Sequence, residues 1–137
     1  MRFYRPTFAE IDLGAICHNV RMIRKLIGRD VKILGVVKAD AYGHGMKEVA
    51  LALVKEGADY LGVASLDEAR ELRQSGIKNK ILALGSILPE EAEGVVRFDV
   101  IQTVSDLKIA RVLSKLGRAR RKNIRVHINS LTNILYF

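Results

Sequence analysis

Short apolar runs alternate with helical patterns along the chain, and this alternation constrains the fold more than any other feature. The apolar runs are typical of buried strands, and they are Ile33–Val37, Tyr60–Ala64, Ile81–Leu84, Val100–Gln102 and Ile124–Ile128. The helical patterns cover Leu13–Ile27, Met46–Glu56, Leu66–Gln74, Pro89–Val96 and a segment from Ser105 or Asp106 to Leu116-Gly117. Buried strands that alternate with helices predict βα units whose strands pair in parallel.

Two α/β folds use such units, and the glycine pattern separates them. The chain has no Gly-x-Gly-x-x-Gly fingerprint, which disfavours a dinucleotide-binding fold and favours a (β/α)8 barrel. Closure of that barrel takes more strands than the sequence supplies, so an open edge is expected where the next strand should pair. We therefore expect a partial (β/α)8 TIM-type barrel of about five parallel strand-helix units.

Local signals also predict one helix start in detail. Ser65 and Glu68 have the spacing of a capping box, in which a serine and a glutamate side chain each bind a free N–H group of the first turn. The helix at Leu66–Gln74 should therefore begin directly after Ser65.

The composition points to a soluble protein. Hydrophobic residues make up 49% and charged residues 28% of the chain, and no apolar run reaches the roughly 20 residues that span a bilayer. The first residues lack the apolar stretch of a signal peptide. Cys17 is the single cysteine and cannot form an internal disulfide, which fits the reducing cytoplasm. We expect a cytoplasmic location and no membrane partner.

The net charge of +8 raises the question of nucleic-acid binding. Most basic residues are spread over helix faces, and the one dense cluster consists of Arg118, Arg120, Arg121 and Lys122. Aromatic residues do not interleave with this cluster, so no surface for stacking bases is predicted. We interpret the cluster as a solvated loop before a strand and expect no nucleic-acid partner.

Lys38 is the strongest candidate for chemistry. It lies at the end of the apolar run Ile33–Val37, and active sites of parallel βα barrels lie at the carboxyl ends of the strands. Partial desolvation at such a place disfavours an ammonium group and frees an amine to attack a carbonyl, as in a Schiff-base lysine. The alternative is a simple solvated lysine at a strand end.

The residues after Lys38 suggest a ligand-binding turn. Tyr42 could donate its hydroxyl to a phosphate or carboxylate, and Gly43 and Gly45 allow close approach of the backbone to a ligand. His44 lies just before a helix N-terminus, where anions bind readily. Gly-His-Gly can equally be only a turn. The spacing is not that of a phosphate loop, and the three histidines are too scattered to predict a metal site.

Several segments of the chain resemble a known family. The segment Val36–Gly45 looks like the pyridoxal phosphate attachment motif of alanine racemases, and Arg5–Leu13 resembles the N-terminal signature of that family. The resemblance continues through Gly57–Asp59, Leu66–Ala69 and Ile81–Gly85, and it covers about residues 5 to 128.

The resemblance implies roles for individual residues. Lys38 would hold pyridoxal 5′-phosphate as an internal aldimine and then act as acid and base on one face of the substrate Cα. Tyr42 would bind the cofactor phosphate, Leu84 would contact the cofactor, and His44 would help to shape the turn. The second base, on the opposite face, would be a tyrosine from the C-terminal domain of the partner subunit.

The resemblance also implies an assembly, a domain organisation and a reaction for the whole protein. Alanine racemases are dimeric cytoplasmic isomerases with an N-terminal barrel and a C-terminal β domain. They interconvert L- and D-alanine for peptidoglycan synthesis, so alanine is the expected substrate.

The likeness ends at Ile128. The family continues there with a lysine, then Val-Asp-Thr-Gly-Met and soon an arginine, whereas this chain continues with Asn129–Phe137. We therefore divide the chain into residues 1–128, the N-terminal part of a pyridoxal-phosphate-binding barrel, and residues 129–137, a tail that does not resemble the family. The abrupt change suggests a frameshift or a premature stop, with the C-terminal β domain missing.

Three hypotheses follow for the chain as it stands. The first is a racemase portion that is inactive by itself. The second is a non-catalytic partial barrel that binds the cofactor or a complementing polypeptide. The third is a product that never accumulates in folded form.

Overall fold

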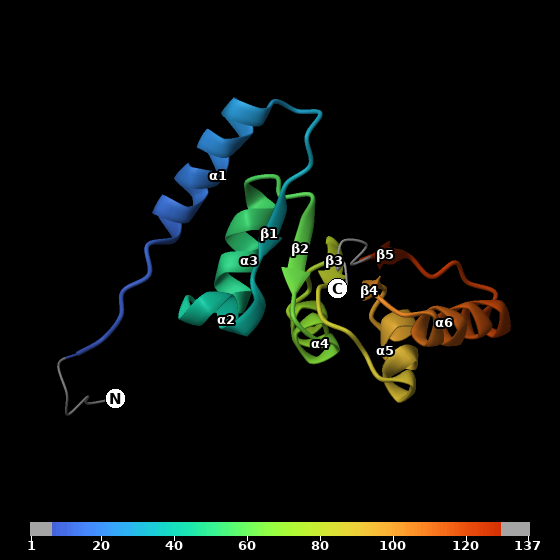
Figure 1. The fold of residues 1–137 in the computed structure, drawn as a ribbon. Helices are drawn as coiled ribbons and strands as arrows, with labels where there is room; N and C mark the ends of the chain where they lie inside the picture. Colours follow the sequence, from blue (N-terminus) through green and yellow to red (C-terminus); the bar gives the residue numbers. More distant parts are fainter. Residues whose placement is uncertain (1–6, 130–137) are drawn as a thin grey trace, which may run out of the picture.

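The chain folds around one parallel β-sheet (Figure 1). The computed structural model describes residues 7–129. The strands are β1 (Leu34–Val36), β2 (Tyr60–Val63), β3 (Lys80–Ala83), β4 (Val100–Val104) and β5 (Val126–Ile128). Each pairs in parallel with the next strand along the chain, in the order β1-β2-β3-β4-β5. This sequential order is that of a (β/α)8 barrel rather than of a doubly wound sheet, in which the order reverses.

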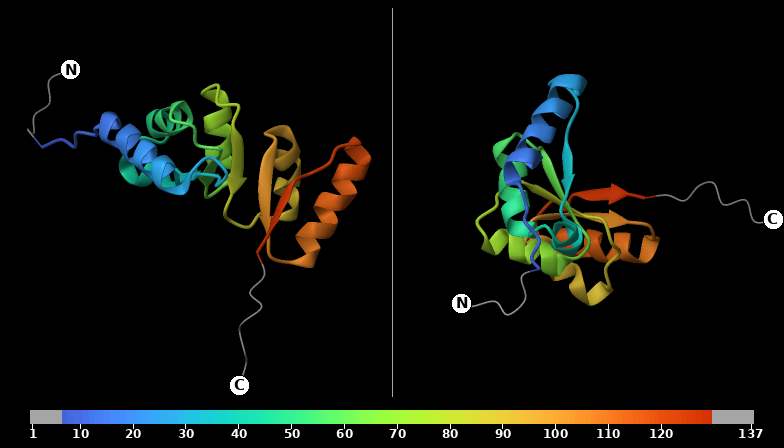
Figure 2. Two further views of the ribbon diagram at one scale, coloured as in Figure 1. Left: turned by 90° about the horizontal axis from the view of Figure 1, so that it is seen from above. Right: turned by 90° about the vertical axis from the view of Figure 1, so that its left-hand side faces the viewer.

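Helices connect the strands. They are α1 (Leu13–Ile27), α2 (Lys38–Gly43), α3 (Met46–Lys55), α4 (Leu66–Gln74), α5 (Ala92–Arg97) and α6 (Leu107–Arg120), with a short 3₁₀ helix, η1, at Pro89–Glu91. Helix α1 packs on α3, and Figure 2 shows the strands rotating progressively from β1 to β5, as the natural twist of a sheet requires. No helix within residues 7–129 is both long and apolar enough to cross a membrane.

The core lies between the sheet and its helices. Leu61 of β2 and Ile81 of β3 are completely buried there, together with Leu72 of α4 and Val95 of α5. Burying side chains of this size stabilises the fold by roughly 1.5–3 kcal/mol each. The helices therefore attach to one face of the sheet through the apolar residues that the sequence pattern selects.

The other face of the sheet is concave and apolar. Leu34, Tyr60, Leu82 and Ile101 line a cavity of about 450 Å³ on it, together with residues of β5. These residues lie on neighbouring strands in parallel register, so their side chains point the same way. This face corresponds to the inside of the barrel.

The end of α6 and the conformation of α2 differ from the sequence prediction. Helix α6 continues to Arg120, so Arg118 and Arg120 belong to its last turn and not to a loop. Gly117, which marks the end in the sequence, lies inside the helix, and its missing side chain leaves room for Lys122: a Cβ atom there would lie 2.9 Å from the Lys122 carbonyl oxygen. The helix ends instead at Arg121, which has a left-handed conformation.

The second difference concerns α2, which the sequence predicts as an irregular loop containing Tyr42. The structure has a left-handed helical turn there.

At the amino ends of the strands, two arginines bind backbone carbonyl groups. Arg24 of α1 donates to the Val31 carbonyl (2.6 Å) and to the Asp59 carboxylate (3.1 Å). Arg73 of α4 donates to the carbonyl oxygens of Phe98 (2.8 Å) and Asn79 (2.8 Å), and further to those of Ile77 and Asp99. Each arginine therefore joins loops from two successive βα units.

Candidate functional site

The carboxyl ends of β1, β2 and β3 meet at one edge of the sheet. The Val37 N–H donates to the Gly62 carbonyl (2.8 Å), and the Leu84 N–H donates to the Val63 carbonyl (2.8 Å), so the ladder extends one residue past β1 and β3. Lys38 follows Val37 directly and is half-buried. The structure thus places Lys38 at the strand end that the sequence predicts, with Leu84 at the same edge.

The turn after Lys38 is strained. Ala39, Asp40, Ala41 and Tyr42 have φ between 51° and 56°, a run of four left-handed residues without a glycine. Each such residue costs roughly 1–2 kcal/mol relative to a right-handed conformation. Strain of this kind persists only where surrounding contacts fix the backbone, and it concentrates at functional sites.

Contacts at the far end of the turn hold this conformation. Asp40 accepts a hydrogen bond from the Met46 N–H at 2.7 Å, so it caps helix α3 from six residues upstream. His44 Nδ1 lies 3.0 Å from the Ala41 carbonyl and 3.2 Å from the Tyr42 carbonyl. His44 therefore acts on the shape of the turn, as the family resemblance suggests.

The two glycines serve the backbone conformation. Gly43 and Gly45 have φ of 83° and 88°, values that L side chains rarely adopt. A Cβ atom on Gly43 would meet nothing within 4 Å, so lack of space does not explain this glycine. The turn needs glycine here for its dihedral angles.

The left-handed turn brings Lys38 and Tyr42 together. The Lys38 Nζ lies 6.0 Å from the centre of the Tyr42 ring, and the Tyr42 side chain is 62% exposed. The amine and the phenol are therefore neighbours on the open side of the strand ends.

An apolar surface adjoins them on the inner face of the sheet. Gly62 has no side chain, and a Cβ atom there would lie 3.3 Å from Val36 Cγ2 and 3.5 Å from Leu84 Cδ1. The Val36 and Leu84 side chains therefore pack closely beside Gly62, whose register partner Val36 lies two residues before Lys38.

Glu68 makes a contact at the site that the sequence does not predict. The predicted capping box forms only in part: Ser65 Oγ accepts from the Glu68 N–H at 3.3 Å, but the Glu68 carboxylate does not bind Ser65 in return. Its Oε2 accepts from the Ala64 N–H (2.6 Å) and its Oε1 from the Ala39 N–H (2.7 Å). The Ser-x-x-Glu spacing predicts that Glu68 caps its own helix, whereas in the structure its carboxylate binds the loops after β1 and β2.

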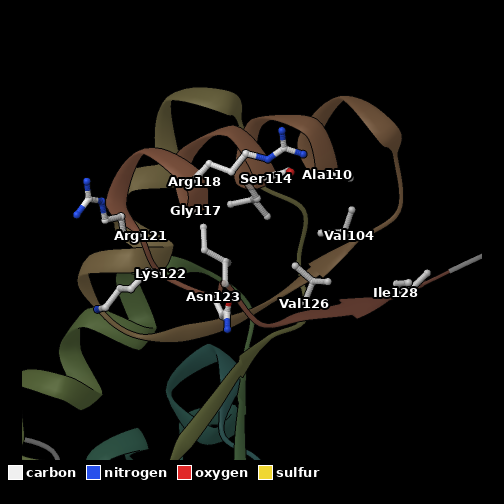
Figure 3. Close-up of a pocket in the computed structure, with 12 residues that line it drawn as sticks. Val104, Ala110, Ser114, Gly117, Arg118, Arg121, Lys122, Asn123, Val126 and Ile128 are labelled. Carbon is white, nitrogen blue, oxygen red and sulfur yellow. The ribbon is translucent and has the colours of Figure 1, made fainter.

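A larger cavity lies at the opposite edge of the sheet, between α6 and β5. Its volume is about 670 Å³, and Figure 3 shows Val104, Val126 and Ile128 on its apolar side, with Arg118 and Lys122 nearby. Three strands separate β5 from β1, so this cavity is not part of the Lys38 site.

The chain also matches known proteins. The model of the alanine racemase N-terminal domain matches residues 11–134.

This chain belongs to the alanine racemase family.

Similar curated proteins are alanine racemase 1 of Caldanaerobacter subterraneus subsp. tengcongensis, 48% identical over 130 residues, and the alanine racemase of Halothermothrix orenii, 42% identical over 127 residues. These matches cover 95% and 93% of this chain and 34% of each relative. The chain thus spans about a third of the length of the curated relatives it matches.

Solved structures agree with this assignment. The alanine racemase of Clostridium difficile 630 superposes with a TM-score of 0.85 at 41% identity, covering 92% of this chain and 33% of that one. A histidine racemase from Leuconostoc mesenteroides subsp. sake superposes with a TM-score of 0.73 at 27% identity, covering 83% of this chain and 30% of that one. The fold is therefore shared by racemases named for different amino acids.

The segment after Ile128 is described only at its first residue. The Asn129 N–H donates to the Val104 carbonyl (3.0 Å), so Asn129 still continues the pairing of β5 with β4. Residues 130–137 lie outside the described part, and the division of the chain at residue 128 stays a prediction.

Proposed function

We propose that this chain is the cofactor-binding portion of an alanine racemase and that it holds pyridoxal 5′-phosphate through the amine of Lys38. The observation that carries the proposal is the half-buried Lys38 at the carboxyl end of β1, fixed by a strained turn beside Tyr42. Alanine is then the substrate, a homodimer the assembly, and D-alanine for peptidoglycan in the cytoplasm the product.

The residues present fit this cofactor. An aldehyde needs a nearby amine, which Lys38 supplies, and the phosphate needs a hydrogen-bond donor, which the Tyr42 hydroxyl supplies. The apolar side chains of Val36 and Leu84, which meet beside Gly62, give a flat aromatic ring a surface to lie on. These are the roles proposed for Lys38, Tyr42 and Leu84.

Lys38 also has a part in the reaction. When bound, the cofactor withdraws electron density from the substrate Cα, so that the Cα proton becomes removable. The Lys38 amine would take or return that proton on its own face. A single base would return the proton to the side it left, so inversion needs a second donor on the opposite face. We assign that donor to a tyrosine of the partner subunit, and we propose that the 137-residue chain alone does not racemise alanine.

Covalent trapping tests the role of Lys38. The purified chain is mixed with pyridoxal 5′-phosphate and then with borohydride, which reduces the C=N bond to a stable secondary amine. Peptide mass spectrometry should find the added group predominantly on Lys38, and the absorbance of the unreduced adduct should be absent in Lys38→Ala. The matched control is Lys47→Ala, which removes an exposed lysine of α3 and should leave the absorbance unchanged. Equal labelling of Lys38 and the exposed lysines would refute the proposal.

A second candidate function rests on β5. Val126 and Ile128 are exposed in this strand, Ile128 by 76%, and an uncovered apolar strand favours pairing with a further segment. In this alternative the chain is a non-catalytic partial barrel that binds a complementing polypeptide. Mixing it with the remaining two thirds of a relative, such as the Caldanaerobacter enzyme, and measuring both association and alanine racemisation separates the two. Racemisation that appears on mixing and is lost in Lys38→Ala would favour the racemase portion, association without racemisation would favour the non-catalytic barrel, and activity of the chain alone would refute the inactivity proposed above.

A further inference from the structure

The Glu68 carboxylate links two loops that are far apart in the sequence. Its Oε1 accepts from the Ala39 N–H at 2.7 Å and its Oε2 from the Ala64 N–H at 2.6 Å. Both distances are short, as is typical of hydrogen bonds to a charged acceptor. The carboxylate therefore joins the loop after β1 to the loop after β2.

The Ala39 N–H belongs to the peptide bond that joins Ala39 to Lys38. This unit is planar and rigid, so a hydrogen bond to its N–H restricts rotation at the Lys38 backbone. Ala39 is also the first residue of the left-handed run, with φ of 51°. Glu68 thus acts where the chain leaves β1 and enters the strained turn.

The other contacts of the turn lie further along it. Asp40 binds Met46, and His44 binds the Ala41 and Tyr42 carbonyl groups. Among the described side chains, Glu68 is the one that binds the backbone directly after Lys38. The direction of the lysine side chain therefore depends on a residue from a different βα unit.

Glu68 is well placed for this task. It lies in the first turn of α4, where free N–H groups stabilise a negative charge. Leu66, Ala69 and Leu72 anchor that helix in the core. Ser65 provides its own cap through the Glu68 N–H, so the carboxylate of Glu68 is free to bind elsewhere.

We propose that Glu68 is a positioning residue that holds the Lys38 turn in its left-handed conformation and thereby sets the reactivity of the Lys38 amine. This inference rests on the proposed function, because it concerns the same lysine and the same cofactor.

The test uses the full chain and two measurements. The first is the rate of borohydride trapping of pyridoxal 5′-phosphate on Lys38. The second is the hydrogen-exchange rate of the Ala39 amide, which needs no cofactor. Glu68→Ala should slow trapping about tenfold, since small displacements of a reacting group have effects of this size or larger. It should also speed Ala39 exchange about tenfold, because the amide loses its acceptor.

Two further variants separate positioning from general stability. Glu68→Gln keeps the length and one acceptor oxygen, so it should recover part of the trapping rate. Ser65→Ala removes the cap of the same helix without touching Ala39, so it should lower stability and leave both Lys38 trapping and Ala39 exchange close to the original. If Ser65→Ala slows trapping as much as Glu68→Ala, or if Glu68→Ala changes neither rate, the positioning role is refuted.

The experiment also distinguishes failure of the two proposals. If borohydride trapping on the unsubstituted chain labels Lys38 no more than other lysines, the proposed function fails. The exchange rate of the Ala39 amide then still decides whether Glu68 holds the turn. Faster exchange in Glu68→Ala would support that role, and unchanged exchange would overturn it.

Discussion

Different side chains bind the backbone at the two ends of the sheet. At the amino ends of the strands, the Arg24 and Arg73 side chains donate to backbone carbonyl groups. At the carboxyl ends, the carboxylates of Glu68 and Asp40 accept from backbone N–H groups. The difference follows from parallel βα geometry, which brings the carbonyl ends of helices to one edge and their N–H ends to the other.

We therefore expect the contacts at the amino edge to determine stability and those at the carboxyl edge to determine the reactivity of Lys38. The arginines join loops that carry no candidate chemical group, so their loss should affect the free energy of unfolding. The carboxylates surround the strained turn that carries Lys38, so their loss should affect the reactivity of that amine. Three variants test this division, in order of decreasing expected effect.

The largest effect is expected at Arg73. Arg73→Ala leaves three part-buried carbonyl groups and one exposed carbonyl group without this donor, which should lower the free energy of unfolding by about 3 kcal/mol in urea denaturation. The matched control is Arg70→Ala on the same helix, which breaks only an exposed pair with Asp67 and should cost less than about 0.5 kcal/mol. If both variants lose a similar free energy of unfolding, Arg73 has no special role in stability.

Tyr42→Phe should have an intermediate effect, limited to the carboxyl edge. Loss of the hydroxyl should weaken binding of pyridoxal 5′-phosphate about tenfold, because a hydrogen bond to a charged group is lost. Binding of pyridoxal, which has no phosphate, should stay the same, and so should the urea midpoint. An equal loss for both compounds would show that Tyr42 does not bind the phosphate.

The smallest effect is expected from Asp59, at the amino edge. The Ile33 N–H and the nearby Lys32 and Arg24 side chains lower the pKa of its carboxyl group to about 2. In the unfolded chain this pKa is about 4. The carboxylate therefore stabilises the fold fully above about pH 4, and this contribution is lost as the pH falls to about 2.

Asp59→Asn should accordingly lower the urea midpoint at pH 7 and match the original chain near pH 2. Asp30→Asn, an exposed control, should change neither value. A difference between Asp59→Asn and the original chain that persists at low pH would contradict this explanation.

Much of the fold could be predicted because its signals are local. Each strand is a short apolar run, and each helix has apolar residues on the face that packs on the sheet, so the order of elements follows from the pattern. The position of Lys38 could be predicted for the same reason, since the end of an apolar run marks the end of a strand.

The errors arose where a residue makes contacts that the pattern of its own segment does not show. Gly117 looks like a helix end in the sequence, but it is a glycine because Lys122 packs against it. Glu68 looks like half of a capping box, but its carboxylate reaches Ala39, which is 29 residues away. No propensity predicts four left-handed residues in succession, because each is unfavourable by itself.

By itself, the sequence determined the succession of parallel βα units, the lysine at the end of the first strand and the membership of the alanine racemase family. Only the tertiary structure decided how that lysine is held. The reason is that apolar periodicity and turn residues act over a few neighbours, whereas the strained turn is stabilised by a carboxylate from the next βα unit. That carboxylate reaches Ala39 because the pairing of β1 with β2 puts their carboxyl ends side by side.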